Sequence, residues 1–127
     1  MTLVEAMPFS VACGVEVDAA SAEEVRGRME WRDGRCTSGG ILHGGALMTL
    51  ADSLGGICAF LNLPDGATTS TIESKTNFVR ALRGGTAWAT TRPLHAGRQT
   101  IVLQTEIRDD AGKLVAFVTQ TQAVLAS

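Results

Sequence analysis

One long stretch of this chain is nearly free of charge, and it limits the folds that the sequence can adopt. Between Gly39 and Asp65 the single charged side chain is Asp52. Large aliphatic residues recur there at intervals of three and four: Leu47, Leu50, Leu54, Ile57 and Leu61. This spacing predicts an amphipathic helix of about five turns that begins near His43, ends by Pro64 and packs its apolar stripe against a sheet.

The rest of the chain shows the two-residue period of strands. Side chains alternate in residues 24–32, 68–80, 86–94, 99–109 and 113–125. Turn-forming residues separate the later segments at 84–85, 95–98 and 109–112. Short joints favour antiparallel neighbours, so we expect one or two strands, the long helix and then a four-stranded meander. The fold class is therefore α+β, as one domain over residues 1–127 with residues 1–7 as a candidate flexible segment.

Charge, cysteine spacing and the amino-terminal sequence indicate which binding partners and which cellular location to expect. The formal net charge of the 127 residues is -2, which gives no electrostatic reason to expect nucleic acid or an anionic membrane as partner. Cys13, Cys36 and Cys58 are too far apart for a disulfide framework or a zinc site, so reduced thiols and no metal are expected. The amino terminus lacks the basic start of a secretory signal, and a cytoplasmic protein is predicted.

The apolar stretch is long enough to suggest a membrane span, but its composition favours a buried helix. It contains His43, Asp52 and several glycines, and basic residues do not flank it. Small residues line the helix face opposite the aliphatic stripe: Gly45, Thr49, Asp52, Gly55, Gly56 and Ala59. Such a face lets a second backbone, a second helix or a thin ligand come close to the carboxylate.

Two features of this helix could carry chemistry. The amides of Gly44 and Gly45 have no partner within the helix and lie at the positive end of its dipole, where they can hold an oxyanion. A tight entry into the helix is the equally weighted alternative. Asp52 follows His43 by nine residues, about 13 Å along the axis, so one helix cannot bring both groups to one carbonyl. If they cooperate, a second copy must supply one of them; otherwise Asp52 is a hydrogen-bonded structural acid.

Three segments carry a resemblance to a known family. They are Gly40-Ile-Leu-His-Gly-Gly-Ala-Leu-Met-Thr-Leu-Ala-Asp52, Thr76-Asn-Phe-Val-Arg80-Ala and Pro93-Leu-His-Ala-Gly-Arg98. The chain resembles the hotdog-fold acyl-CoA thioesterases of the phenylacetate-degradation type over most of residues 8–126. The spacing of nine residues from the histidine to the acid is the more specific part of the match.

The resemblance implies roles for particular residues. Gly44 would polarise the thioester carbonyl, Asp52 of the partner subunit would act as nucleophile or as base for the water, and His43 would orient the thioester. A strand hydroxyl often assists in this family; Thr71 is the first candidate for it, and Ser70 and Ser74 are the alternatives. Further residues are expected at the substrate: Gly45, Thr37, Ser70, Ser74, Phe78, and the basic Arg80, Arg83 and Arg98, which would meet the phosphates of coenzyme A or else be solvated. A homodimer or homotetramer is implied, with no cofactor beyond the coenzyme A of the substrate.

Two departures from the family pattern leave alternatives open. Thr37 stands where the family commonly has Asn or Gln, and Gly56 stands where some relatives carry Ser or Thr. A non-catalytic acyl-CoA-binding or regulatory module on the same fold is therefore the second hypothesis, and a hotdog hydratase is the third. A phosphate-binding loop, a serine-hydrolase elbow and a dinucleotide-binding fold are excluded, because the sequence lacks their motifs.

Overall fold

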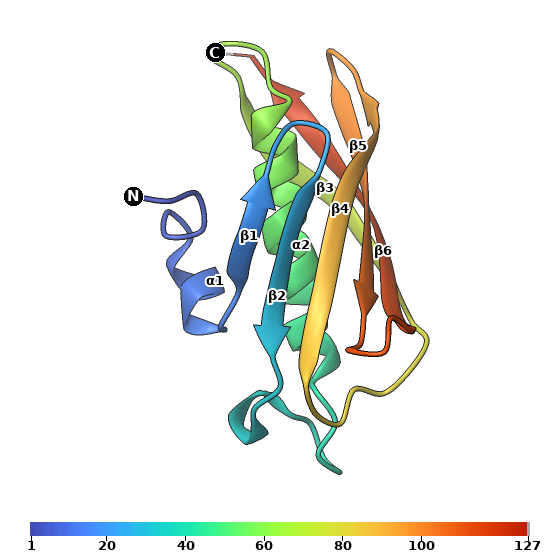
Figure 1. Cartoon of the computed structure of the whole chain (residues 1–127). Coiled ribbons are helices and arrows are strands. Elements are labelled where there is room, and N and C mark those ends of the chain that lie inside the picture. Colours follow the sequence, from blue (N-terminus) through green and yellow to red (C-terminus); the bar gives the residue numbers. More distant parts are fainter. Residues whose placement is uncertain (127) are drawn as a thin grey trace.

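A computed structural model describes residues 1–126, so Ser127 of the predicted domain lies outside the described residues. One antiparallel sheet wraps around one long helix, α2 (Figure 1). The strand order in the sheet is β1-β2-β4-β5-β6-β3. The elements are α1 (Pro8–Ala12), β1 (Glu16–Ala20), β2 (Val25–Glu30), a 3-10 turn (Asp33–Arg35), α2 (Gly44–Leu61), β3 (Thr68–Phe78), β4 (Thr86–Ala96), β5 (Thr100–Arg108) and β6 (Leu114–Leu125).

Helix α2 forms where the aliphatic period predicted it. Leu47, Leu50, Leu54 and Ile57 are buried against the concave face of the sheet. The helix is long and apolar enough to span a membrane by length and composition, yet half of its residues are buried inside the fold. This burial supports the predicted core helix.

The strands supply the other half of the core. Their inward-facing residues alternate with less buried ones, as in β5, where Ile101, Leu103 and Ile107 are fully buried between partly buried neighbours. Gly27 of β2 has a packing role, because a Cβ there would lie 3.0 Å from Cδ1 of Leu54. The sheet therefore holds α2 at close range and fixes which helix face remains outside.

The predicted meander is wrong in one respect: β3 does not pair with β4. Strand β4 has β2 on one side and β5 on the other, so the open place for β3 is the outer edge of β6. Residues 79–85 therefore form a crossing connection instead of a hairpin at 84–85. The positive φ of 71° at Gly85 serves this loop, and its carbonyl accepts a hydrogen bond from the Trp31 amide.

The hairpin expected at residues 95–98 is also displaced. His95 and Ala96 are the last residues of β4, and the reversal follows at residues 97–99. A bulge between Pro93 and His95 adds one residue to β4, which lengthens the strand beyond the predicted end. The other predicted hairpin, at 109–112, joins β5 to β6.

Candidate functional site

The entry into α2 is fixed by hydrogen bonds from two other parts of the chain. The amide of Leu42 donates to the carbonyl of Leu82, and the amide of His43 donates to the carbonyl of Arg35. His43 is the N-cap residue, and its Nδ1 accepts a hydrogen bond from the Gly45 amide at 2.7 Å. A neutral imidazole that accepts at Nδ1 carries its proton on Nε2. His43 therefore offers a donor at its exposed edge.

The two glycine amides differ in their availability. The Gly45 amide, expected to be open, is occupied by His43. The Gly44 amide donates to no acceptor within residues 1–126, and it lies at the positive end of the helix dipole. Gly44 lines a hollow of about 320 Å³ that is mostly apolar and that also touches Thr37, Phe78 and Arg80. Gly44 is thus the amide that can hold an oxyanion.

Asp52 lies two turns further along α2, in a second hollow of about 380 Å³. Its carboxyl oxygen Oδ1 accepts a hydrogen bond from Nε2 of Gln120 at 3.0 Å. Surrounding protein atoms raise the pKa of Asp52 above its ordinary value, because desolvation outweighs the hydrogen bond from Gln120, which lowers it. A carboxylate in this setting is a stronger base than one in water.

Gly44 and Asp52 cannot act on the same atom within one chain. Eight residues separate them, which is about 12 Å along a helix with a rise of 1.5 Å per residue. Within one chain, the free Gly44 amide and the Asp52 carboxylate therefore lie at two separate positions along α2.

The structure distinguishes between the candidate hydroxyl groups. Ser74 of β3 lines the same hollow as Asp52. The hydroxyl of Thr71 accepts a hydrogen bond from Nε2 of Gln122 at 2.8 Å, which ties it to β6. A bulge between Thr71 and Glu73 separates the two candidates. Ser70 is exposed and, by alternation with Thr71, faces away from the helix. Of the three candidate hydroxyls, Ser74 is thus the one that lines the hollow of Asp52, beside Ser10, Thr49 and Ser53.

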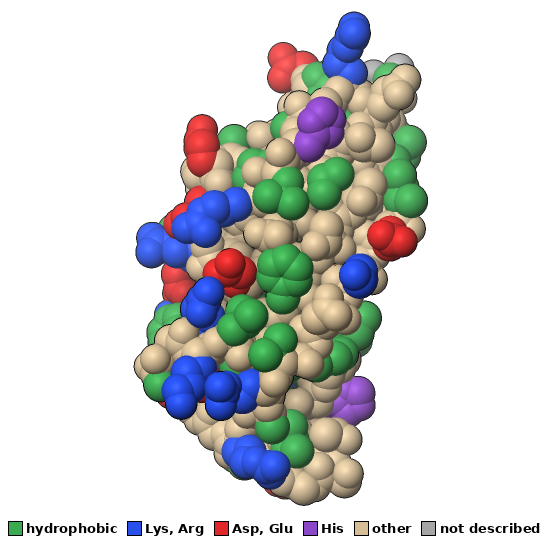
Figure 2. All heavy atoms as spheres, turned by 90° about the vertical axis from the view of Figure 1, so that its right-hand side faces the viewer, with side chains coloured by type: hydrophobic (Ala, Val, Ile, Leu, Met, Phe, Trp, Pro, Cys, Tyr) green, Lys and Arg blue, Asp and Glu red, His purple; other side chains and the backbone are tan. Residues whose placement is uncertain are grey.

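The basic candidates occupy opposite ends of the molecule. Arg80 and Arg83 lie in the connection between β3 and β4, at the same end as Gly44, and Nη1 of Arg83 donates to the carbonyl of Gly39. Figure 2 shows Lys and Arg side chains at the lower end of the face that it draws and others further up that face; the connection between β3 and β4 lies at the lower end in Figure 1. Arg98 follows β4 at the opposite end. One chain therefore does not bring Arg98 to the other two.

The expected open face of α2 is narrower than the sequence indicated. Gly55 and Ala59 are buried, and the side chain of Gln120 from β6 lies against Gly55. Met48, Asp52 and Phe60 remain exposed. Gln120, which the sequence analysis missed, is the residue that covers Gly55. The available signal was polarity in an alternating strand, since Gln120 lies two residues after the inward-facing Val118.

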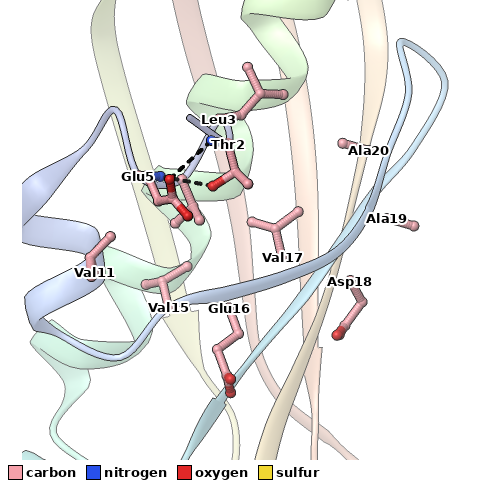
Figure 3. A pocket seen from close by; sticks show the side chains of 11 residues that line it. Thr2, Leu3, Glu5, Val11, Val15, Glu16, Val17, Asp18, Ala19 and Ala20 are labelled. Atoms are coloured by element: carbon pink, nitrogen blue, oxygen red, sulfur yellow. Dashed lines mark hydrogen bonds between the residues drawn. The ribbon is translucent and has the colours of Figure 1, made fainter.

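Another hollow, of about 530 Å³, lies between the amino-terminal segment and β1. Figure 3 shows Val11, Val15 and Val17 around it, with Thr2 and Glu5 joined by hydrogen bonds. Neither Asp52 nor the turn at His43 contributes to it. Among the described residues, no three His, Cys, Asp or Glu side chains lie close enough together to hold a metal ion.

A family model described as "Thioesterase superfamily" matches residues 39–116, which include His43, Gly44 and Asp52. The chain belongs to the thioesterase superfamily. This membership confirms the predicted hotdog fold and the predicted class of enzyme, a thioester hydrolase. The phenylacetate-degradation subtype stays a prediction.

Individual members of the superfamily agree with this assignment. A thioesterase from Pseudomonas aeruginosa, solved in a mutant form, superimposes with a TM-score of 0.91 at 28% identity, over 97% of this chain and 91% of that one. The 1,4-dihydroxy-2-naphthoyl-CoA hydrolase of Escherichia coli is 36% identical over 68% of this chain and 63% of its own length. A Vibrio cholerae relative is 41% identical over 69% of this chain and 59% of its own. The last two matches thus span less than two thirds of those relatives.

Proposed function

We propose that this thioesterase-superfamily protein hydrolyses the thioester of a small or medium aromatic or aliphatic acyl-CoA, in active sites at a dimer interface. The observation that carries the proposal is that α2 holds both groups the reaction needs. The Gly44 N–H donates to no acceptor within residues 1–126, and Asp52 is a carboxylate of raised pKa. The name of the Escherichia coli relative, a hydrolase of an aromatic acyl-CoA, supports the substrate class.

The edge of the sheet supports the dimer. Strand β3 is 11 residues long, and its outer side pairs with nothing within residues 1–126. Ile72, Phe78 and Val79 expose more than half of their surface in or next to it. A long edge of this kind is a template for pairing with another chain. Antiparallel pairing of β3 with its copy would create a twofold axis.

The position of that axis would bring the two halves of the site together. Met48 is midway between Gly44 and Asp52 on α2, and it lines the same hollow as Ser74 of β3. An axis through β3 near Ser74 therefore carries Gly44 of one subunit toward Asp52 of the other. Each dimer would contain two equivalent sites, and a tetramer would be a pair of such dimers.

The chemistry of each site follows from these groups. The Gly44 amide donates to the thioester oxygen and stabilises the negative charge that develops there. Asp52 of the partner subunit either takes a proton from the attacking water or attacks the carbonyl carbon itself, giving an anhydride that water then cleaves. In both routes the C–S bond breaks, coenzyme A leaves as its thiol and the acyl group leaves as a carboxylic acid. Arg80 and Arg83 stand at the Gly44 end, where they can bind phosphate.

The proposal is tested by thiol release from a panel of aromatic and aliphatic acyl-CoAs, with light scattering to measure the oligomeric state. Turnover of at least one member by a dimer or tetramer is expected. Tight acyl-CoA binding without thiol release would instead select the regulatory module suggested by Thr37. Hydration of an enoyl-CoA without thiol release would select the hydratase.

Removing the free amide should slow the reaction. Gly44 is the first residue of α2, a position where proline is tolerated, and the ψ of 136° at His43 suits a following proline. Gly44→Pro deletes the N–H, and we expect kcat to fall about 10²-fold. Gly44→Ala is the matched control, because its Cβ also comes to 3.0 Å from Phe78 Cζ while the N–H is kept. Equal losses in the two variants would show that crowding by Phe78, and not the amide, is responsible.

A further inference from the structure

A polar side chain is buried behind the proposed catalytic carboxylate. Gln120 of β6 is only 1% exposed, on the same inward-facing side of the strand as Val118. Its Nε2 donates to Oδ1 of Asp52 at 3.0 Å, and its Oε1 is buried without a hydrogen-bond partner within residues 1–126. Burying an amide with one unsatisfied end costs stability. A contribution to packing alone does not account for glutamine at this position.

The helix makes space for this side chain. A Cβ at Gly55, one turn after Asp52, would overlap Oε1 of Gln120. Alanine would be the better helix former at a buried position in the middle of α2. The chain therefore has a poor helix former at Gly55 and a buried, partly unsatisfied amide at Gln120. Together these two residues allow the contact between Gln120 and Asp52.

We infer that Gln120 is a positioning residue, which holds Asp52 by Oδ1 so that its other oxygen, Oδ2, faces the hollow where the substrate carbonyl would lie. Gly55 provides the slot that Gln120 occupies. This inference rests on the proposed function, because it assigns Gln120 to the hydrolysis that Asp52 would carry out.

The electrostatic setting of Asp52 makes the contact measurable. Within the described part of the chain, Asp52 is the one titratable group lining its hollow; the other contributions come from Phe9 and Ser10 of α1, Ser74 of β3 and uncharged residues of α2. Glu73 and Lys75 flank Ser74 and point to the opposite face of the sheet. The amide of Gln120 is therefore the specific group that favours the ionised carboxylate against desolvation.

Gln120→Met is the direct test, because it keeps the size of the side chain and removes the donor. The acidic limb of the kcat/KM profile, where the rate falls as Asp52 becomes protonated, should move up by about one pH unit. At neutral pH, kcat should fall roughly 10-fold with KM nearly unchanged, because the carboxylate loses its fixed orientation.

Gln122→Met is the matched control. Gln122 is 2% exposed on the same face of β6, but it bonds Thr69 and Thr71 instead of Asp52. Its substitution should leave the acidic limb in place. A limb that moves equally in both variants, or that stays in place in Gln120→Met, would overturn the inference.

Two further measurements keep the test decisive if Gln120→Met fails to fold or if the protein lacks turnover. Gln120→Glu preserves the shape and should move the limb further than methionine, because two carboxyl groups then share one site. A ¹³C NMR titration of the Asp52 carboxyl requires no substrate, and its midpoint should rise in the Gln120 variants but not in Gln122→Met. An unchanged midpoint refutes the role of Gln120, whereas absent thiol release by the parent refutes the proposed hydrolysis.

Discussion

Asp52→Asn should lower kcat of acyl-CoA hydrolysis by at least about 10³-fold, the largest loss expected from any single substitution in this protein. Asparagine has nearly the same shape as aspartate, and its Oδ1 can still accept the hydrogen bond from Gln120. It can neither take a proton from water nor attack the thioester. The measurement is thiol release under saturating acyl-CoA, and binding of the substrate should persist.

The same substitution should not destabilise the fold. The pKa of Asp52 in the folded chain lies above its unfolded value, so ionised Asp52 costs stability once the pH has risen through the folded pKa. At neutral pH, asparagine removes that cost, and Tm should stay equal or rise. Asp65→Asn, at an exposed residue beyond the end of α2, is the control and should retain the parent rate. Rapid hydrolysis by Asp52→Asn would refute the assigned role.

The sequence predicted the elements of this fold better than their pairing. The spacing of aliphatic residues in α2 and the alternation of buried residues in β5 are local properties, because each depends only on neighbouring residues in the sequence. The pairing of β3 with β6 is not local, because it depends on β2 having already taken the place beside β4. Short joints suggested a meander, and the connection over residues 79–85 shows that adjacency in the chain does not determine adjacency in the sheet.

The site divides in the same way. Asp52 stood out because it is the single charge in an apolar helix, and the turn at His43 stood out by its glycines. Occupation of the Gly45 amide by His43 depends on the rotamer of the N-cap residue, which the sequence does not specify. The contact between Gln120 and Asp52 joins residues 68 positions apart, so it emerges only when β6 is packed against the helix.

Mixing two inactive variants should restore activity, and this result would place the active site between subunits. Subunits with Asp52→Asn keep the Gly44 amide, and subunits with Gly44→Pro keep the carboxylate. In a mixed dimer, one site would carry both defects, while the other would combine the two intact groups. Random assortment of equal amounts makes half of the dimers mixed, so about a quarter of the parent activity should return.

The size of this recovery separates the two possible arrangements of the site. A recovery to about a quarter of the parent rate exceeds the residual activity expected of Asp52→Asn alone by more than about 10²-fold. The mixture is made by co-refolding or by co-expression with two tags, and dimers carrying both tags should reach about half of the parent rate, since one of two sites is intact. Mixing either variant with itself controls for refolding. If Gly44 and Asp52 of the same chain formed the site, every subunit in the mixture would keep one defect and no activity would return.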